Sequence, residues 1–295
     1  MKILITGANG LLGQKIVEFC IARKIEFFAT SAGENRNPAC PNSHYSVMDI
    51  TAKGEVENLI KRMLPSHIIH TAAITNVDYC QLNPGECEKV NNEASIFLAS
   101  ICERMNIHFQ FLSTDFVFDG ESGNYSEEDD VNPISIYGQS KANTERFLIE
   151  GKNKNWSIIR TIIVYGKGNN LSRSNLIVWA KESLENSVEM KIIDDQYRAP
   201  TFVDDLANAC IEVVLKGRTG VFNISGPITI SIYEIVEKIA AHFNYSMSKV
   251  SRISSKELDQ PAKRPPKTGF NLAKAKKDLN YSPRTIEESL DLIFR

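Results

Sequence analysis

The chain has 295 residues, of which 42% are hydrophobic and 24% are charged, and its formal net charge at pH 7 is −2. Such a length and apolar content suffice for a substantial core in one large domain or two small ones. The near-neutral balance, with Lys and Arg spread along the chain, argues against a nucleic-acid or membrane-surface partner attracted by charge. A few dispersed cations are still enough to hold a small anionic ligand.

The cysteines and the apolar runs indicate the cellular setting. The 6 cysteines show no C-x-x-C pair and no regular spacing, so we interpret them as reduced core thiols of a cytosolic protein. The apolar run in MKILITG is too short for a signal peptide, and no apolar stretch approaches the roughly 18 residues of a membrane span. We therefore expect a soluble, cytoplasmic protein with no membrane partner.

The first half of the chain alternates short apolar runs with segments of helical periodicity. The apolar runs predict strands over residues 2–6, 26–31, 43–50, 67–73, 108–114 and 156–166. The helical pattern predicts helices over residues 11–24, 51–64, 84–105 and 135–145, and Thr51 is expected to cap the second of them. This alternation indicates a parallel sheet with helices on both faces, and right-handed crossovers make it a Rossmann-type, doubly wound α/β fold.

After residue 165 the alternation is less regular. Helices are expected over 174–185, 201–217 and 231–243, strands over 190–193 and 220–225, and a Pro- and Lys-rich segment over 259–279. We interpret residues 1–165, with about 201–225, as a dinucleotide-binding domain. Residues 166–200 and 226–295 are expected to form a smaller, mixed α/β substrate-binding region.

The stretch TGANGLLG, residues 6–13, is typical of a phosphate-binding turn. It places Gly7, Gly10 and Gly13 three apart, after a predicted strand and at the start of a predicted helix. Gly7 permits the tight turn, Gly10 lets a pyrophosphate approach the backbone, and Gly13 lets the helix pack close to the strand. The helix N-terminus offers unpaired N–H groups and a partial positive charge to the anion. A plain glycine turn is the alternative, and the position at the first strand–helix junction favours the dinucleotide site.

The ends of the second and third predicted strands should meet the adenosine half of the dinucleotide. An NAD-selective site usually places Asp or Glu at the end of the second strand, to bond the ribose 2′-hydroxyl. Ser31 lies there instead, and Arg36 follows a few residues later. A hydroxyl and a nearby cation suit a 2′-phosphate, so this pair favours NADPH over NADH. Glu34 is the residue that would reverse this cofactor preference. Asp49 and Ile50 are placed to bracket the adenine, although Asp49 would equally serve as the cap of the following helix.

Tyr137 and Lys141 lie four residues apart in SIYGQSKANTE, so they share one face of a helix. A second Tyr-x-x-x-Lys, Tyr245 to Lys249, shows that spacing alone proves little, and we assign that pair to the surface. The first pair lies in the dinucleotide-binding half and follows Thr114, at the carboxyl end of a strand, where ligands bind in open α/β sheets. An ammonium near the phenol, together with a positive nicotinamide, should lower the pKa of Tyr137 from about 10. Such a tyrosine exchanges a proton with an alcohol oxygen.

These motifs carry a resemblance that covers essentially the whole chain. The sequence resembles the extended short-chain dehydrogenase/reductases, and within them the dTDP-4-dehydrorhamnose reductases. The matching stretches are ITGANGLLG, HTAAITNVDYCQLNP, VNNEA, LSTDFVFDG, YGQSK, RTIIVYGKGNN, DDQYRAPTFVDDLA and RPPKTGFNLAKAKKDL. STDFVFDG and QYRAPT are more discriminating than the glycines.

The resemblance implies roles for individual residues. Tyr137 would donate a proton to the C4 ketone of the sugar, Lys141 would bind the nicotinamide ribose and tune Tyr137, and Thr114 would hold the ketone oxygen. Asp115 would touch the sugar. NADPH or NADH would deliver hydride to dTDP-4-dehydro-β-L-rhamnose, giving dTDP-β-L-rhamnose. The residues implied to line the cofactor, besides the glycines, are Asn9, Leu11, Leu12, Ala72, Ala73, Ile74 and Leu112.

Five further residues are candidates for substrate binding. Ile163 stands where the family often has a tryptophan that contacts the sugar, so the flat stacking surface is lost and the exact sugar is in doubt. Thr75 and Asp78 follow the fourth predicted strand and could reach the substrate, or could make an ordinary loop Asx bond. Arg198 and Arg264 are candidates to grip the diphosphate, with plain surface roles as the alternative.

Two rival functions remain open from the sequence. One is an epimerase or dehydratase of the same superfamily, although a dehydratase would want Glu beside Thr114, and DFVF follows instead. The other is a regulatory subunit, because similar chains serve as partners of methionine adenosyltransferase. No metal site is predicted from the sequence: His67 and His70 are interpreted as structural and the acidic run 127–130 as a solvated loop, with a weak divalent site there or at a subunit contact, such as one for Mg²⁺, as the alternative. The expected partner is a nucleotide sugar, with a homodimer as the oligomer considered.

Overall fold

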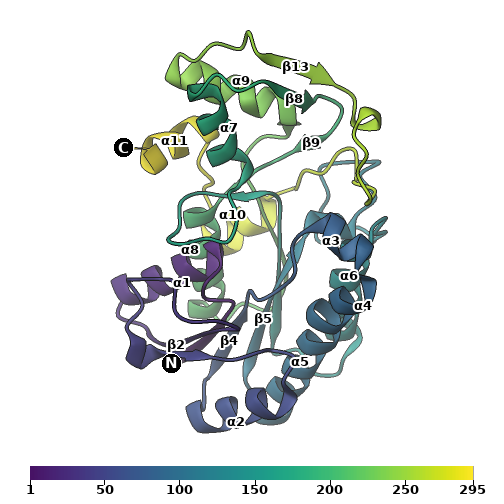
Figure 1. The fold of residues 1–295 in the computed structure, drawn as a ribbon. Helices are drawn as coiled ribbons and strands as arrows, with labels where there is room; N and C mark the ends of the chain where they lie inside the picture. The colour runs from purple at the N-terminus through teal and green to yellow at the C-terminus, as the bar shows by residue number, and fades with distance from the viewer. Residues whose placement is uncertain (295) are drawn as a thin grey trace.

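A seven-stranded parallel sheet forms the centre of the computed structural model, which describes residues 1–294 (Figure 1). In sheet order the strands are β3 (Tyr45–Val47), β2 (Glu26–Ser31), β1 (Lys2–Thr6), β4 (His67–His70), β5 (His108–Thr114), β6 (Trp156–Thr161) and β11 (Gly220–Ile224). The order reverses direction between β1 and β4, which is the doubly wound arrangement predicted from the alternation. The fold class is therefore confirmed.

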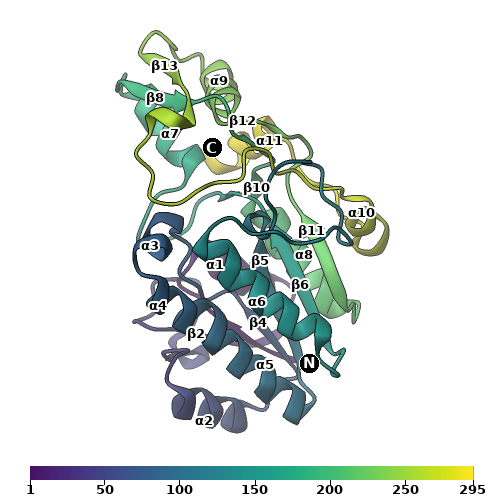
Figure 2. The same cartoon turned by 90° about the vertical axis from the view of Figure 1, so that its right-hand side faces the viewer.

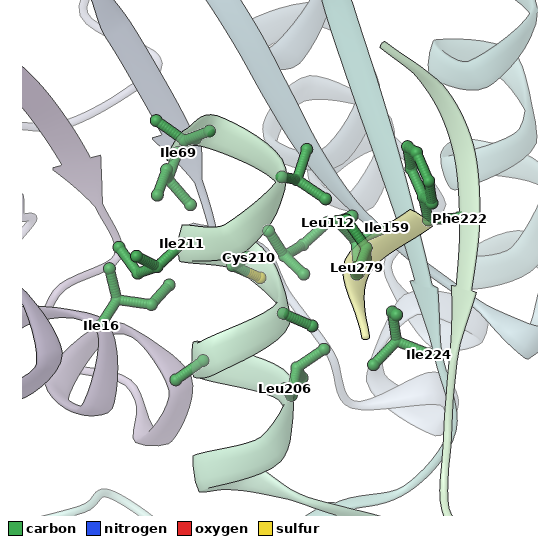
Figure 3. Close-up of a cluster of buried hydrophobic side chains, with 14 of the residues drawn as sticks. Ile16, Ile69, Leu112, Ile159, Leu206, Cys210, Ile211, Phe222, Ile224 and Leu279 are labelled. Carbon is green, nitrogen blue, oxygen red and sulfur yellow. The ribbon is translucent and has the colours of Figure 1, made fainter. Parts of the chain in front are cut away.

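Helices cover both faces of this sheet. One face carries α1 (Leu11–Ala22), α8 (Val203–Leu215) and α10 (Ala273–Leu279), and the other carries α2 (Lys53–Met63), α5 (Ala94–Met105) and α6 (Ile136–Glu150). The near-continuous apolar strands are buried on both sides by these two layers. Figure 3 shows the first cluster, in which Ile16 of α1, Ile211 of α8 and Leu279 of α10 surround strand residues such as Ile159.

A smaller region lies above the carboxyl ends of the strands (Figures 1 and 2). Its helices are α7 (Leu176–Glu185), α9 (Ile232–Phe243) and α11 (Ile286–Phe294), which share a third apolar cluster. Its strands pair as β8 (Met190–Ile193) with β13 (Val250–Ile253), β7 (Val164–Tyr165) with β10 (Thr201–Phe202), and β9 (Tyr197–Arg198) with β12 (Ile230–Ser231). The division into two domains at the predicted boundaries stays a prediction; Leu279 of α10, near the C-terminus, packs in the sheet cluster.

Two local expectations are wrong, and a third is confirmed with an irregularity. The helix predicted from Thr51 begins at Lys53, with Ala52 at the cap position and no capping side chain. The helix predicted over 84–105 is present over these residues, as α4 (Pro84–Cys87), a π-helical turn at Glu88–Glu93 and α5. The strand predicted over 156–166 breaks between β6 and β7, because Thr201 occupies the carbonyls of Ile162 and Ile163.

Candidate functional site

A cleft with a volume of about 990 Å³ lies at the carboxyl ends of the strands, between the sheet and the smaller region. Every residue that we predicted to contact cofactor or substrate lines this cleft, with the exception of Asp78. The topology explains the convergence, because in a doubly wound sheet the loops after successive parallel strands meet at the point where the strand order reverses. The residues come from the loops after β1, β2, β3, β4, β5 and β6, from α6, and from the smaller region.

The glycine turn has the close approaches that its spacing predicts. Gly7 has a φ of +71°, and a Cβ there would lie 2.6 Å from the backbone nitrogen of Ala72. A Cβ at Gly13 would overlap the carbonyl oxygen of Gly7. Gly10 is the N-cap of α1 and provides no capping side chain, so the first N–H groups of the helix are free to face an anion.

Asn9 organises the loop at the end of β2. Its backbone N–H donates to Ser31 Oγ at 3.0 Å, its side-chain Nδ2 donates to the Glu34 carbonyl at 2.7 Å, and its Oδ1 accepts from the Arg36 N–H at 2.9 Å. Within residues 1–294, the Arg36 guanidinium donates to the Asn170 carbonyl alone, at 3.4 Å. Asn9 of the glycine turn thus holds the Ser31 side chain and the Arg36 backbone, at the place predicted to meet the adenosine ribose.

At the end of β3, Asp49 does not cap α2, whose cap position is Ala52, but it orders the turn before that helix. Its Oδ1 accepts from the Thr51 N–H at 2.8 Å, and the side chain also lines the cleft beside the buried Ile50. One carboxylate oxygen therefore orders the turn before α2. Its predicted contact with the adenine stays a prediction.

Tyr137 and Lys141 are both buried, one helix turn apart on α6. Ser135 caps this helix, because its side chain accepts from the Gly138 N–H at 3.2 Å, and this fixes the first turn that carries Tyr137. Lys141 Nζ donates to the Leu112 carbonyl at 2.9 Å and lies 4.5 Å from the centre of the Phe111 ring. Burial lowers the pKa of Lys141 to about 8.

The pKa of Tyr137 departs from our prediction. Burial raises it well above its ordinary value, and the nearby Asp115 adds to the rise, whereas a hydrogen bond with Thr114 and the charge of Arg173 lower it. Lys141 is not among the groups that act most strongly on the phenol. The prediction that Lys141 lowers the pKa of Tyr137 is therefore wrong when the protein's own groups alone are considered, because the Lys141 ammonium is directed at the Leu112 carbonyl. The raised pKa keeps the phenol protonated at neutral pH.

Thr114 and Asp115 follow β5 and are buried together. Thr114 Oγ1 donates to Asp115 Oδ1 at 3.1 Å and accepts from the Phe116 N–H at 3.2 Å. Asp115 Oδ2 accepts from Thr268 Oγ1 at 2.5 Å and lies 3.7 Å from Arg198 Nε. Burial raises the pKa of Asp115, and Arg198, Thr268 and Thr114 lower it.

The predicted substrate-binding cations are already engaged by protein groups. Arg198 is buried and donates to the carbonyls of Tyr197, Pro265 and Pro266, which is the geometry of a structural arginine. Arg264 lines the cleft, and its guanidinium forms a two-pronged ion pair with Asp78, at 3.1 and 2.6 Å. Asp78 does not itself line the cleft, but it contacts Arg264, which does.

Thr75 and Ile163 both line the cleft. Thr75 Oγ1 accepts from Arg173 Nη2 at 2.5 Å, and this arginine, on the loop after β7, is a cleft residue for which we predicted no role. Ile163 has a φ of +32°, which is unusual for a β-branched residue and stores backbone strain beside the cleft.

Asn91 is a second residue that we missed. It lies on the π-helical turn and binds both backbone groups of Ile74, accepting from the N–H at 2.8 Å and donating to the carbonyl at 2.9 Å. It therefore holds the loop after β4 that lines the cleft. The stretch VNNEA belongs to the family resemblance, but only the fold shows which backbone groups Asn91 meets.

The residues present fit a dinucleotide. A Cβ at Gly7 or Gly13 would fill the space of the glycine turn. Ser113 lies beside Thr114 at the cleft, and its buried Oγ has no hydrogen-bond partner within residues 1–294. A buried hydroxyl without a partner is costly unless a ligand satisfies it. Ser113 is thus a candidate donor to a bound ligand.

Two findings concern metals and membranes. Residues 1–294 contain no group of three or more His, Cys, Asp or Glu side chains placed to hold a metal ion. His70 lies buried with its two ring nitrogens at 2.7 Å from Thr6 Oγ1 and 3.0 Å from Ser95 Oγ. Within the same residues, every helix is too short or too polar to cross a bilayer.

The chain is similar to proteins of known class along its whole length. The RmlD substrate binding domain family matches residues 1–295. A dTDP-4-dehydrorhamnose reductase of Aggregatibacter actinomycetemcomitans is 29% identical over 98% of this chain and 97% of its own. The methionine adenosyltransferase 2 subunit beta of Bos taurus is 29% identical over 86% of this chain and 75% of its own.

Solved structures agree with this result. A dTDP-4-dehydrorhamnose reductase of Clostridium acetobutylicum superposes with a TM-score of 0.87 at 29% identity, covering 99% of this chain and 98% of its own. The Bacillus anthracis dTDP-4-dehydrorhamnose reductase, in complex with NADP, gives a TM-score of 0.81 at 26% identity, covering 99% and 98%.

Proposed function

Because the chain belongs to the RmlD substrate binding domain family and is an NAD(P)H-dependent reductase of the dTDP-4-dehydrorhamnose reductase type, we propose that it reduces the C4 ketone of a nucleotide 4-keto-6-deoxysugar. The substrate that we propose is dTDP-4-dehydro-β-L-rhamnose, or a close relative, with dTDP-β-L-rhamnose as the product. The observation that supports this most strongly is the convergence of Tyr137, Thr114 and Lys141 beside the glycine turn in one cleft.

Proton transfer is assigned to Tyr137. The bound nicotinamide supplies the hydride to the carbonyl carbon. The ketone oxygen gains negative charge as this happens, and the Tyr137 phenol donates its proton there, since its raised pKa keeps it protonated at neutral pH. Thr114 lines the cleft together with Tyr137 and lowers the pKa of the phenol. Lys141 Nζ, held by the Leu112 carbonyl, lies where the nicotinamide ribose is expected.

NADPH is the proposed cofactor. Ser31 and Arg36 lie at the end of β2, and the Arg36 guanidinium is exposed with one long hydrogen bond to a carbonyl, so a 2′-phosphate can take it over. NADH remains the alternative, with Glu34 as the group that would accept a 2′-hydroxyl. The ratio of kcat/KM with NADPH to that with NADH tests this choice, and Arg36→Gln is expected to lower it.

The diphosphate of the substrate is assigned to the cationic side of the cleft. Arg264 and Arg173 line it from the smaller region and from the loop after β7, and guanidinium groups bind phosphate oxygens in a bidentate manner. Asp78 holds Arg264 in place until the anion arrives. The cleft supports an anionic, sugar-sized ligand but does not select the base.

A regulatory role is the second candidate function, because the methionine adenosyltransferase 2 subunit beta has the same 29% identity to this chain as the reductase, although over a smaller share of both chains. The experiment that separates the two is incubation of the purified protein with a panel of dTDP- and UDP-4-keto-6-deoxyhexoses and NADPH. We expect loss of absorbance at the NADPH band and a product reduced at C4. No turnover with any member of the panel would contradict the proposal. Light scattering of the same sample tests the predicted homodimer.

A further inference from the structure

Thr268, in the C-terminal segment, is linked to Thr114 through the carboxylate of Asp115. It is fully buried, and its Oγ1 donates to Asp115 Oδ2 at 2.5 Å, while Thr114 Oγ1 donates to Asp115 Oδ1 at 3.1 Å. Both carboxylate oxygens are therefore occupied, one from each side of the cleft. Neither the family resemblance nor the sequence pattern assigns a role to Thr268.

The segment that carries Thr268 is fixed by β9. The Thr268 N–H donates to the Tyr197 carbonyl at 3.0 Å, and the Arg198 guanidinium donates to the carbonyls of Pro265, at 2.6 Å, and Pro266, at 3.3 Å. Arg198 Nε also lies 3.7 Å from Asp115. The hydroxyl of Thr268 thus reaches Asp115 from a rigid frame rather than from a mobile loop.

The orientation of Thr114 depends on this carboxylate. The Thr114 hydroxyl proton is directed to Asp115, and its oxygen accepts from the Phe116 N–H at 3.2 Å. Tyr137 is buried and lines the same cleft as Thr114. A carboxylate that rotates would turn the Thr114 hydroxyl within this cleft.

We propose that Thr268 is a positioning residue for proton transfer: its hydroxyl fixes the Asp115 carboxylate, which orients the Thr114 hydroxyl in the cleft that Tyr137 also lines. The inference rests on the proposed reductase function, because that function makes Tyr137 the proton donor. It assigns the smaller region a part in the geometry of the reacting groups, beyond the binding of the nucleotide sugar.

The kinetic test compares Thr268→Val with Thr268→Ser. Val keeps the shape and removes the hydroxyl, whereas Ser keeps the hydroxyl. We expect kcat to fall roughly tenfold in the Val variant, the loss that follows from one hydrogen bond of ordinary strength, with both KM values within about twofold of the parent protein. The Ser variant is expected to recover most of kcat.

The control is Thr229→Val, because Thr229 lies against Gly269, next to Thr268, and takes no part in this network. Its kcat should equal that of the parent protein. If Thr268→Val does not fold, Thr268→Ala replaces it in this comparison. An unchanged kcat in Thr268→Val, or a loss that Thr268→Ser does not recover, would overturn the proposal.

A second measurement does not depend on turnover. The charged or titratable groups facing Asp115 are Arg198 of β9 and Tyr137 of α6, and Thr268 supplies a hydrogen bond that lowers the carboxyl pKa. Carbon-13 NMR of labelled aspartate, assigned with Asp115→Asn, should show the Asp115 pKa higher in Thr268→Val than in the parent protein and restored in Thr268→Ser. Equal Asp115 pKa values in all three proteins would refute the proposal that Thr268 fixes the Asp115 carboxylate. An inactive parent protein would refute only the reductase function.

Discussion

Burial dominates the chemistry of Tyr137 and Lys141. Both side chains leave water on folding, which disfavours their charged forms, so the pKa of the phenol rises and that of the ammonium falls to about 8. The two shifts leave the phenol protonated and the ammonium mostly protonated at pH 7. A ligand oxygen that accepts a hydrogen bond from Lys141 would stabilise its charged form.

The shift at Lys141 predicts a pH dependence of stability. The folded pKa of about 8 lies below the unfolded value of 10.5, so the unfolded state binds more protons between these values and stability rises with pH across this window. Below pH 8 the buried ammonium costs about 3 kcal/mol. We expect Lys141→Met to unfold at higher urea than the parent protein at pH 7, and this advantage to shrink by pH 10.

The control for this prediction is Lys249→Met, because Lys249 is exposed and no pH-dependent difference should arise there. Urea unfolding of the three proteins at both pH values gives the comparison. A Lys141→Met advantage that stays constant from pH 7 to pH 10 would show that the lysine titrates normally in the folded protein.

At the scale of the element, the glycine turn and α1 act as one unit. The helix starts at Gly10 without a side-chain cap, and Gly7 and Gly13 let the turn, the Ala72 backbone and the helix approach closely. These contacts place the free N–H groups of the first turn at the cleft. The helix dipole and the unpaired donors then favour a pyrophosphate there.

Gly13→Ala is expected to weaken NADPH binding at least tenfold, because its Cβ would overlap the Gly7 carbonyl and displace the turn. Fluorescence titration with NADPH measures the change. Gly54→Ala is the matched control, since Gly54 lies in α2 with open space around its missing Cβ, and alanine there should stabilise the helix by roughly 0.5–1 kcal/mol. Equal NADPH affinity in both variants would exclude a role for the turn.

At the scale of the molecule, one ion pair joins the two sides of the cleft. Asp78 lies on α3 (Val77–Leu82), after β4, and Arg264 lies in the segment before Thr268. The pair is partly exposed, so its net contribution to stability is small. Its value lies in holding Arg264 at the cleft.

Arg264→Gln is therefore expected to raise the KM for the nucleotide sugar several-fold, while kcat and the affinity for NADPH stay near the parent values. Steady-state kinetics with varied sugar nucleotide measures this. Arg252→Gln is the control, because Arg252 of β13 pairs with Glu237 of α9 and is not among the residues that line the cleft. A change in the affinity for NADPH instead of the KM would place Arg264 at the dinucleotide.

The alternation of apolar runs was enough to predict the parallel sheet, because strands buried on both faces and amphipathic helices have different periodicities. The glycine spacing and the Tyr137–Lys141 pair predicted which loops meet in the cleft. Partners of side chains could not be predicted: Arg198 and Asp115 are held by Thr268, Pro265 and Pro266, which are far away in sequence. The break after β6 depends on Thr201, and no local pattern encodes it.

The central claim is that Tyr137 gives its proton to a ketone in the cleft, and Tyr137→Phe tests it most directly. The measurement is turnover of a dTDP-4-keto-6-deoxysugar with NADPH, together with the Kd for NADPH of the same protein. We predict a loss of turnover of at least roughly 100-fold, with the Kd within about twofold of the parent value. Turnover equal to that of the parent protein would contradict the account.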